Sequence, residues 1–339
     1  MLCRKAKSLS LLVCCFPKKF KFSSCSIVGA VREPPDKMLI QRPQGRFAKR
    51  PYIRKISGFG TSLIFFFLFF VSQTAVAAPW LQDSGAGLVR LNTQVFRSSS
   101  YRDVRGDRVS MPTMTDVRFS FDGEYGLGKR VTLFGRLDWL DHNSINGQTV
   151  RGSGFSMTEQ ASNTQLGDAE LGLRIMLGDW GRGVLATELV LGLPSGDSNN
   201  KYGLQTGDGE FNALTVVSSG YRFERIPLSF WAYVGFNQRT HGFSDEVRMG
   251  GEASWTSWRL TLSFFTHATL PLRNGDPRVQ GGLGGLYGNN VQVVWLGGRI
   301  NMRMTDHFDA MFAVEDGEAQ KNVPNKMAYH GGIGYRWGN

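Results

Sequence analysis

Cysteine is confined to the beginning of this chain. All four cysteines, Cys3, Cys14, Cys15 and Cys25, precede residue 78, so residues 78–339 contain none. That larger part can therefore form no disulfide, present no thiolate nucleophile and hold no cysteine-bound metal.

Residues 78–339 also lack long apolar runs and helical periodicity. No segment of about 20 apolar residues is present, which excludes a membrane-spanning helix from this part of the chain. A Gly-rich strand-to-helix motif for binding nucleotides is absent as well, so no energy-using chemistry is indicated.

Excess positive charge is restricted to the same early segment as cysteine. The whole chain has a formal net charge of +11, but residues 1–77 contain 14 Lys and Arg against only Glu33 and Asp36. The remaining 25 basic and 26 acidic residues nearly cancel. This balance excludes the broad basic surface with which proteins bind nucleic acid, so no nucleic-acid partner is expected.

Residues 1–77 are predicted to form an export leader. Basic residues in 46–55 precede the apolar run TSLIFFFLFFV at 61–71, and the small-x-small triplet AVA follows at 75–77. This order is typical of a cleaved secretory signal, with cleavage before Ala78. An uncleaved anchor is the weaker alternative, because the apolar run is shorter than a spanning helix requires.

The leader contains a second possible start. Met38 could itself begin a complete signal peptide over about 38–77. We therefore interpret residues 1–37 as a possible over-extended start of translation.

Strict alternation of apolar and polar residues is the main feature of 78–339. Residues 117–125 read VRFSFDGEY, and a two-residue period sends the two sets of side chains to opposite faces of a strand. Charged residues fall on one parity in each such stretch. The pattern predicts an all-β protein, a transmembrane antiparallel up-and-down β-barrel of about 12 strands, with a soluble β-sandwich as the alternative.

The predicted strands leave long and short connections in alternation. The expected long loops are 97–115, 141–165, 194–209 and 271–290, an asymmetry typical of outer-membrane barrels. The strands are predicted at 88–96, 116–125, 131–140, 166–177, 183–193, 210–223, 228–240, 245–255, 258–270, 291–304, 308–316 and 326–337.

Aromatic residues gather near the predicted short turns, as in the interfacial girdle of a membrane barrel. They are Tyr125, Trp180, Tyr221, Phe223, Trp255, Trp258, Phe308, Tyr335 and Trp337. The last strand also carries apolar and aromatic residues on one parity up to Trp337, resembling the segment by which outer-membrane barrels are recognised for assembly. The expected partners are thus the bilayer of the bacterial outer membrane, the barrel-assembly machinery and small solutes.

Charges on the polar parity are expected to face the lumen, since each Arg or Lys facing the bilayer midplane costs roughly 2–4 kcal/mol. Eleven arginines and eleven acids share that face, so the lumen as a whole is nearly neutral. Candidate lumen-lining residues are Arg118, Asp122, Glu124, Arg136, Asp138, Asp168, Glu170, Arg174, Glu188, Arg222, Arg239, Arg248, Glu252, Arg259, Arg299 and Arg303. Arg90, Glu210, Glu246, Asp309, Glu315 and Arg336 complete the set.

Inward aromatic residues and histidines raise two further possibilities. Possible solute-contact aromatics are Trp231, Tyr233, Phe265 and Trp295. A barrel-wall hydrolase would need a serine beside a histidine, for which Ser263, His267 and His330 are candidates without a surrounding nucleophile motif. We therefore expect no enzyme, and no cofactor or metal site, because no ligand spacing recurs.

Short Gly-rich motifs carry a resemblance to a known family. The sequence reads LGDAELGLR at 166–174, LGLPSGD at 191–197, SGYRF at 219–223 and GYRW at 334–337. These segments resemble a bacterial outer-membrane family named for its association with the meta-pathway of phenol degradation. The resemblance implies a barrel that passes small, possibly aromatic, molecules.

The sequence thus favours a passive outer-membrane channel for small, possibly organic solutes, with a charge-paired lumen. A plugged barrel whose loops serve surface binding or adhesion, or a structural scaffold, is the alternative, and the barrel-wall hydrolase is the weakest of the three hypotheses.

Overall fold

The computed structural model describes residues 78–149, 156–200, 202–279, 288–325 and 327–338. The predicted export leader, 1–77, lies outside these residues. Among the residues described, no helix is long and apolar enough to cross a membrane.

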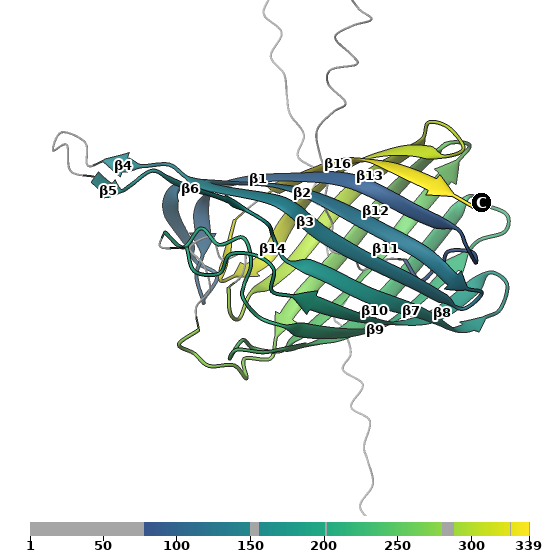
Figure 1. Ribbon diagram of the computed structural model, residues 1–339, viewed down its shortest axis with the longest axis horizontal. Coiled ribbons are helices and arrows are strands. Elements are labelled where there is room, and N and C mark those ends of the chain that lie inside the picture. The colour runs from purple at the N-terminus through teal and green to yellow at the C-terminus, as the bar shows by residue number, and fades with distance from the viewer. Residues whose placement is uncertain (1–77, 150–155, 201, 280–287, 326, 339) are drawn as a thin grey trace, which may run out of the picture. The chain divides into compact units, whose positions relative to one another are not determined.

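Twelve long antiparallel strands form a closed barrel, as the sequence predicts (Figure 1). Each pairs with its neighbour in chain order, and pairing of the first with the last, from Gly87↔Trp337 to Arg97↔Met327, closes the sheet. The strands are β1 (Gly87–Arg102), β2 (Arg108–Gly128), β3 (Val131–Ile145), β7 (Ala169–Asp179), β8 (Gly183–Leu193), β9 (Asn212–Arg222), β10 (Leu228–Arg239), β11 (Glu246–Ser257), β12 (Leu260–Pro271), β13 (Gln292–Arg303), β14 (Phe308–Lys321) and β16 (Met327–Trp337).

The prediction of a long loop at 97–115 is wrong. Strand β1 continues to Arg102 and β2 begins at Arg108, so the connection is only 103–107. Asp103 closes the turn by accepting hydrogen bonds from the backbone N–H groups of residues 105 and 107, each at 2.8 Å. The outer part of β1, RSSSYR at 97–102, is polar on both faces, so the alternation that marks the rest of this strand is absent there.

Further regular structure occupies the predicted loop 141–165. Strand β3 runs to Ile145, β6 (Ala161–Gln165) pairs with its outer half, and β4 (Gln148–Thr149) pairs with β5 (Ser156–Thr158). Strand β14 likewise passes its predicted end at 316, and β15 (Val323–Pro324) pairs with the end of β1.

A β-bulge at Trp139 reverses the two faces of β3. Phe119 of β2 pairs with Leu140, whereas the next residue, Ser120, pairs with Asp138. One residue of β3 therefore has no counterpart on β2, and the inward parity changes from even to odd along β3.

The bulge brings two sets of polar residues to the inside of one strand. Arg136 and Asp138 face inward before it, and Asp141 and Asn143 face inward after it, both with no exposed surface. An unbroken alternation would have placed the last two toward the outside of the barrel.

The outer face of the barrel is apolar and ends in an aromatic girdle. Leu171, Val217 and Val234 are each about half exposed on outward positions of neighbouring strands. At the end with the short turns, the rings of Phe308 and Tyr335 lie 5.1 Å apart, and Trp258 is 89% exposed. This surface suits lipid, with amphipathic rings at one interface.

Two outward valines distinguish a lipid-facing from a water-facing position. Val234 of β10 and Val109 of the β1–β2 hairpin are similarly exposed, at 52% and 48%. We expect Val234→Arg to lower the unfolding free energy in lipid vesicles by about 2–4 kcal/mol. Val109→Arg should change it by less than about 0.5 kcal/mol, because the hairpin projects beyond the bilayer. Guanidine titration of both variants measures the difference, and equal losses would contradict this placement of the hairpin.

Candidate functional site: the barrel lumen

The described residues line two cavities along the barrel interior. The loop-end cavity, at the end that carries the longer connections, has a volume of about 280 Å³. The turn-end cavity, at the end with the short turns and the C-terminus, has a volume of about 410 Å³. Arg, Asp and Glu make up about half of the residues that line each cavity.

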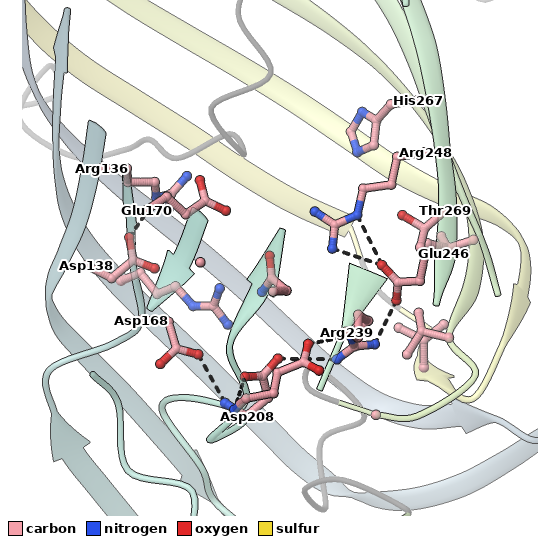
Figure 2. Close-up of a pocket in the computed structure, with 18 of the residues that line it drawn as sticks. Arg136, Asp138, Asp168, Glu170, Asp208, Arg239, Glu246, Arg248, His267 and Thr269 are labelled. Atoms are coloured by element: carbon pink, nitrogen blue, oxygen red, sulfur yellow. Dashed lines mark hydrogen bonds and ion pairs between the residues drawn. The ribbon is translucent and has the colours of Figure 1, made fainter. Parts of the chain in front are cut away.

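Arg239 organises one wall of the loop-end cavity (Figure 2). Its guanidinium contacts three carboxylates: Asp208 Oδ2 at 3.2 Å from Nη2, Glu246 Oε1 at 2.8 Å from Nη1, and Glu210, which accepts a short hydrogen bond from Nε. Arg248 extends the network, with Nη2 at 2.9 Å from the second oxygen of Glu246. The planar fork of arginine is suited to such multidentate pairing.

The opposite wall carries a second set of ion pairs on β2 and β3. Arg136 Nε lies 2.8 Å from Asp138 Oδ1. Arg118 bridges two fully buried carboxylates, with Nη2 at 2.8 Å from Asp116 and Nε at 3.1 Å from Asp141. The bulge in β3 makes this bridge possible, because it turns the second carboxylate inward.

The connection between β8 and β9 folds into the barrel. Leu204 is fully buried against Ile145 and Ala161. Its backbone carbonyl accepts a hydrogen bond from Asn163 Nδ2 at 2.8 Å, and the next carbonyl accepts one from Asn143 Nδ2 at 2.9 Å. This inward loop, residues 194–200 and 202–211, narrows the loop end and supplies two of the acids around Arg239.

Two loop carboxyls have raised pKa values. Burial raises the pKa of Glu210 to about 8, in spite of Arg239, and Asp208 adds to the effect. Burial raises the pKa of Asp168 to about 6, although its carboxylate accepts hydrogen bonds from the backbone N–H groups of Gly196 and Asp208 at 2.9 and 3.1 Å. Both carboxyls lie in connections rather than in strands. Because their pKa values are raised, the loop end loses negative charge as the pH falls from about 8 to about 6.

Arginines dominate the turn-end cavity. Arg174 has no exposed surface, and its Nε lies 2.8 Å from Glu188 while Nη2 lies 3.8 Å from Glu124. Arg90 and Arg336 share the carboxylate of Asp309, at 3.5 Å for the first and by a shorter contact for the second. Buried carboxylates thus hold most of these guanidinium groups against the wall.

A segment before the first strand occupies the turn end of the lumen. We call residues 78–83 the N-terminal plug. The carbonyl of Trp80 accepts a hydrogen bond from Arg174 Nη1 at 2.9 Å, and the guanidinium carbon of Arg222 lies 3.9 Å from the centre of its ring. Gln82 donates from Nε2 to Glu124 at 2.7 Å. These contacts join the plug to three strands.

Glycine at position 220 makes room for the plug. A Cβ atom there would lie 2.8 Å from Pro79 Cγ and 2.9 Å from the ring of Trp80. The sequence did not predict this plug, because no pattern in 78–83 marks a segment that folds into a barrel.

Of the sixteen candidate lumen-lining residues, twelve line one of the two cavities and four line neither. Asp122, Glu188, Arg222 and Glu252 line neither and instead pair with wall or plug groups. The loop-end cavity is lined by Arg118, Arg136, Asp138, Asp168, Glu170, Arg239 and Arg248. The turn-end cavity is lined by Glu124, Arg174, Arg259, Arg299 and Arg303.

The four predicted aromatic residues do not form one site. Trp231 and Tyr233 stack on β10, with centroids 5.7 Å apart. Phe265 and Trp295 flank His267 on β12 and β13, at 6.3 and 6.0 Å between centroids, and of the four only Trp295 lines either cavity.

The serine and histidine candidates are arranged for packing rather than nucleophilic attack. Ser263 Oγ lies 2.8 Å from Ser254 Oγ. His267 and His330 instead turn their Nε2 atoms toward Glu315, at 4.0 and 3.0 Å. Within the part of the chain that the structure describes, no group of three or more His, Cys, Asp or Glu could hold a metal ion.

Comparison with solved structures supports the architecture. The fold is similar to that of an outer membrane channel from Pseudomonas putida F1, with 13% identity, a TM-score of 0.58, and coverage of 79% of this chain and 100% of that one. The KdgM porin in complex with disordered oligogalacturonate (6%, 0.41, 75% and 99%) and the Ralstonia pickettii toluene transporter TbuX (11%, 0.38, 75% and 90%) are more distant. No protein-family model and no curated protein match this chain. The predicted fold, an antiparallel up-and-down β-barrel of 12 strands, is confirmed.

Removing the plug should widen the lumen. We expect Gly220→Val to displace residues 78–83 and raise single-channel conductance at least about twofold, because the added methyl groups overlap the plug. Ser219→Val, on the outward face of the same strand, is the matched control and should leave conductance unchanged. Planar-bilayer recording of folded protein measures both, and unchanged conductance in Gly220→Val would show that the plug does not limit the path.

Acidification should weaken any cation preference at the loop end. Because the raised pKa values are about 8 for Glu210 and about 6 for Asp168, protonation removes negative charge in two stages between about pH 9 and pH 5. Reversal potentials under a salt gradient across this range should show both stages. Glu210→Gln should abolish the upper stage and keep the lower one.

Proposed function

We propose that this protein is a passive outer-membrane channel for small solutes. The observation that carries the proposal is the division of the barrel into an apolar outer face and a charged inner face that encloses two cavities. Such a lumen offers a hydrated path bounded by fixed side chains. The likeness to an outer membrane channel supports this use of the fold.

The proposal includes a direction of insertion and a route to the membrane. Residues 1–77 act as a cleaved export leader, and the turn end faces the periplasm. The aromatic last strand, β16, presents the barrel to the assembly machinery. The loop end then faces outward, with the β1–β2 hairpin extending its rim.

Small organic solutes, aromatic ones among them, are the proposed cargo. The family resemblance supports this class, as does the presence of Trp80 and Trp295 in the linings of the two cavities. We propose no catalytic role, since Ser263 bonds to another serine and the two histidines face a carboxylate.

A plugged barrel that serves as a surface scaffold is the second candidate. The inward loop and the N-terminal plug both favour it, because each occupies one end of the lumen.

Uptake by proteoliposomes separates the two candidates. We expect vesicles that contain the folded protein to swell in a pentose such as arabinose several times faster than in a trisaccharide such as raffinose. Heat-modified mobility on gels verifies folding, and empty vesicles give the baseline. Swelling at the baseline rate in every solute would establish the scaffold and reject the channel.

A further inference from the structure

Positive and negative charges are separated along the axis of the lumen. Above about pH 8, where Glu210 is ionised, the loop-end cavity is lined by four arginines and seven carboxylates, an excess of three negative charges. The turn-end cavity is lined by six arginines and two carboxylates, an excess of four positive charges. The arginines at the turn end are Arg90, Arg174, Arg259, Arg299, Arg303 and Arg336, and the carboxylates are those of Glu124 and Asp309.

Carboxylates behind the lining do not remove this separation. At the turn end, Glu188, Glu252 and Asp306 pair with lining arginines, which leaves an excess of one positive charge. At the loop end, Asp116 and Asp141 pair with Arg118, which increases the excess to five negative charges. The difference between the two ends falls only from seven charges to six.

Individual contacts show why the turn end has an excess of positive charge. Two arginines, Arg90 and Arg336, share the single carboxylate of Asp309. Arg303 lines the cavity with no carboxylate within ion-pair distance among the described residues. At the loop end the ratio is inverted, since Arg239 alone is surrounded by Asp208, Glu210 and Glu246.

We infer that the lumen is a bipolar filter that holds back ions of either sign and admits solutes without net charge, including zwitterions. A cation is attracted by the acidic loop end and repelled by the arginines beyond it, and an anion meets the opposite sequence. A neutral or dipolar solute has no such barrier. This inference rests on the proposed channel function and names the class of solute that the channel takes.

Three probes of similar size test the inference. Choline, pivalate and glycine betaine each carry a trimethyl head but have a charge of +1, −1 and zero. We expect wild-type vesicles to take up betaine about tenfold faster than choline and pivalate at low salt, a ratio that a few excess charges across about 10 Å can produce. Raising the salt from 0.1 M to 1 M shortens the screening length from about 10 Å to about 3 Å and should reduce the ratio.

Ionic current gives an independent readout of the same separation. When the loop side is positive, cations in the acidic half and anions in the arginine half both move toward the centre and accumulate there. The reverse voltage depletes the centre, so current should be several times larger with the loop side positive. This rectification is measured at pH 9, where Glu210 and Asp168 are ionised.

Charge reversal at the turn end provides the matched comparison. Arg303→Glu combined with Arg259→Glu removes four units of positive charge and should abolish rectification and raise choline uptake. Lys129→Glu reverses a charge in the exposed β2–β3 turn outside the cavity and should change neither. Should the double variant fail to fold, Arg303→Gln alone should roughly halve the rectification ratio.

The outcomes separate the inference from the function on which it rests. Betaine uptake with symmetrical current, or uptake of choline or pivalate as fast as betaine, would overturn the bipolar filter and keep the channel. Absence of both arabinose uptake and current from folded protein would overturn the channel itself.

Discussion

Closure of the sheet is the constraint on which the rest of this structure depends. In lipid every backbone N–H and C=O group must find a partner within the protein, and an open sheet edge leaves a row of them unpaired. Pairing of β1 with β16 removes both edges. Once the sheet is closed, alternation divides each strand into a face toward lipid and a face toward the lumen, so the charges of twelve strands converge on one enclosed space.

That enclosure explains the prevalence of ion pairs on the inner wall. A carboxylate such as Glu188, with almost no exposed surface, is stable only with a cation such as Arg174 beside it. The pairs fix the width of the bore by holding long side chains against the strands. The stability of the wall and the charge of the solute path therefore depend on the same residues. A substitution that alters the charge of the path also alters the stability of the wall.

The sequence predicted those features that depend on periodicity alone. Alternation was sufficient to anticipate the number of strands, their antiparallel order and the shared face of Arg174 and Glu188. It failed at the outer part of β1, where serines on both faces erase the pattern. It also missed Asp208, which reaches Arg239 on an inward loop, and Trp80, which precedes the first strand. Contacts of irregular segments depend on tertiary packing that no local pattern encodes.

The bulge at Trp139 has a consequence for how this chain can vary. Side chains along a strand of a closed barrel alternate between the lumen and the outside. One extra residue therefore sends every later side chain of that strand to the opposite face. Beyond the bulge, Asp141 and Asn143 are on the lumen side only because of that shift. Loss of a single residue here would exchange the two faces of the outer half of β3 and turn the carboxylate of Asp141 away from Arg118 to the outer face of the barrel. A change of length in this segment therefore keeps both faces in place only if it adds or removes two residues, whereas the connection 103–107 lies between two strands and carries no such restriction.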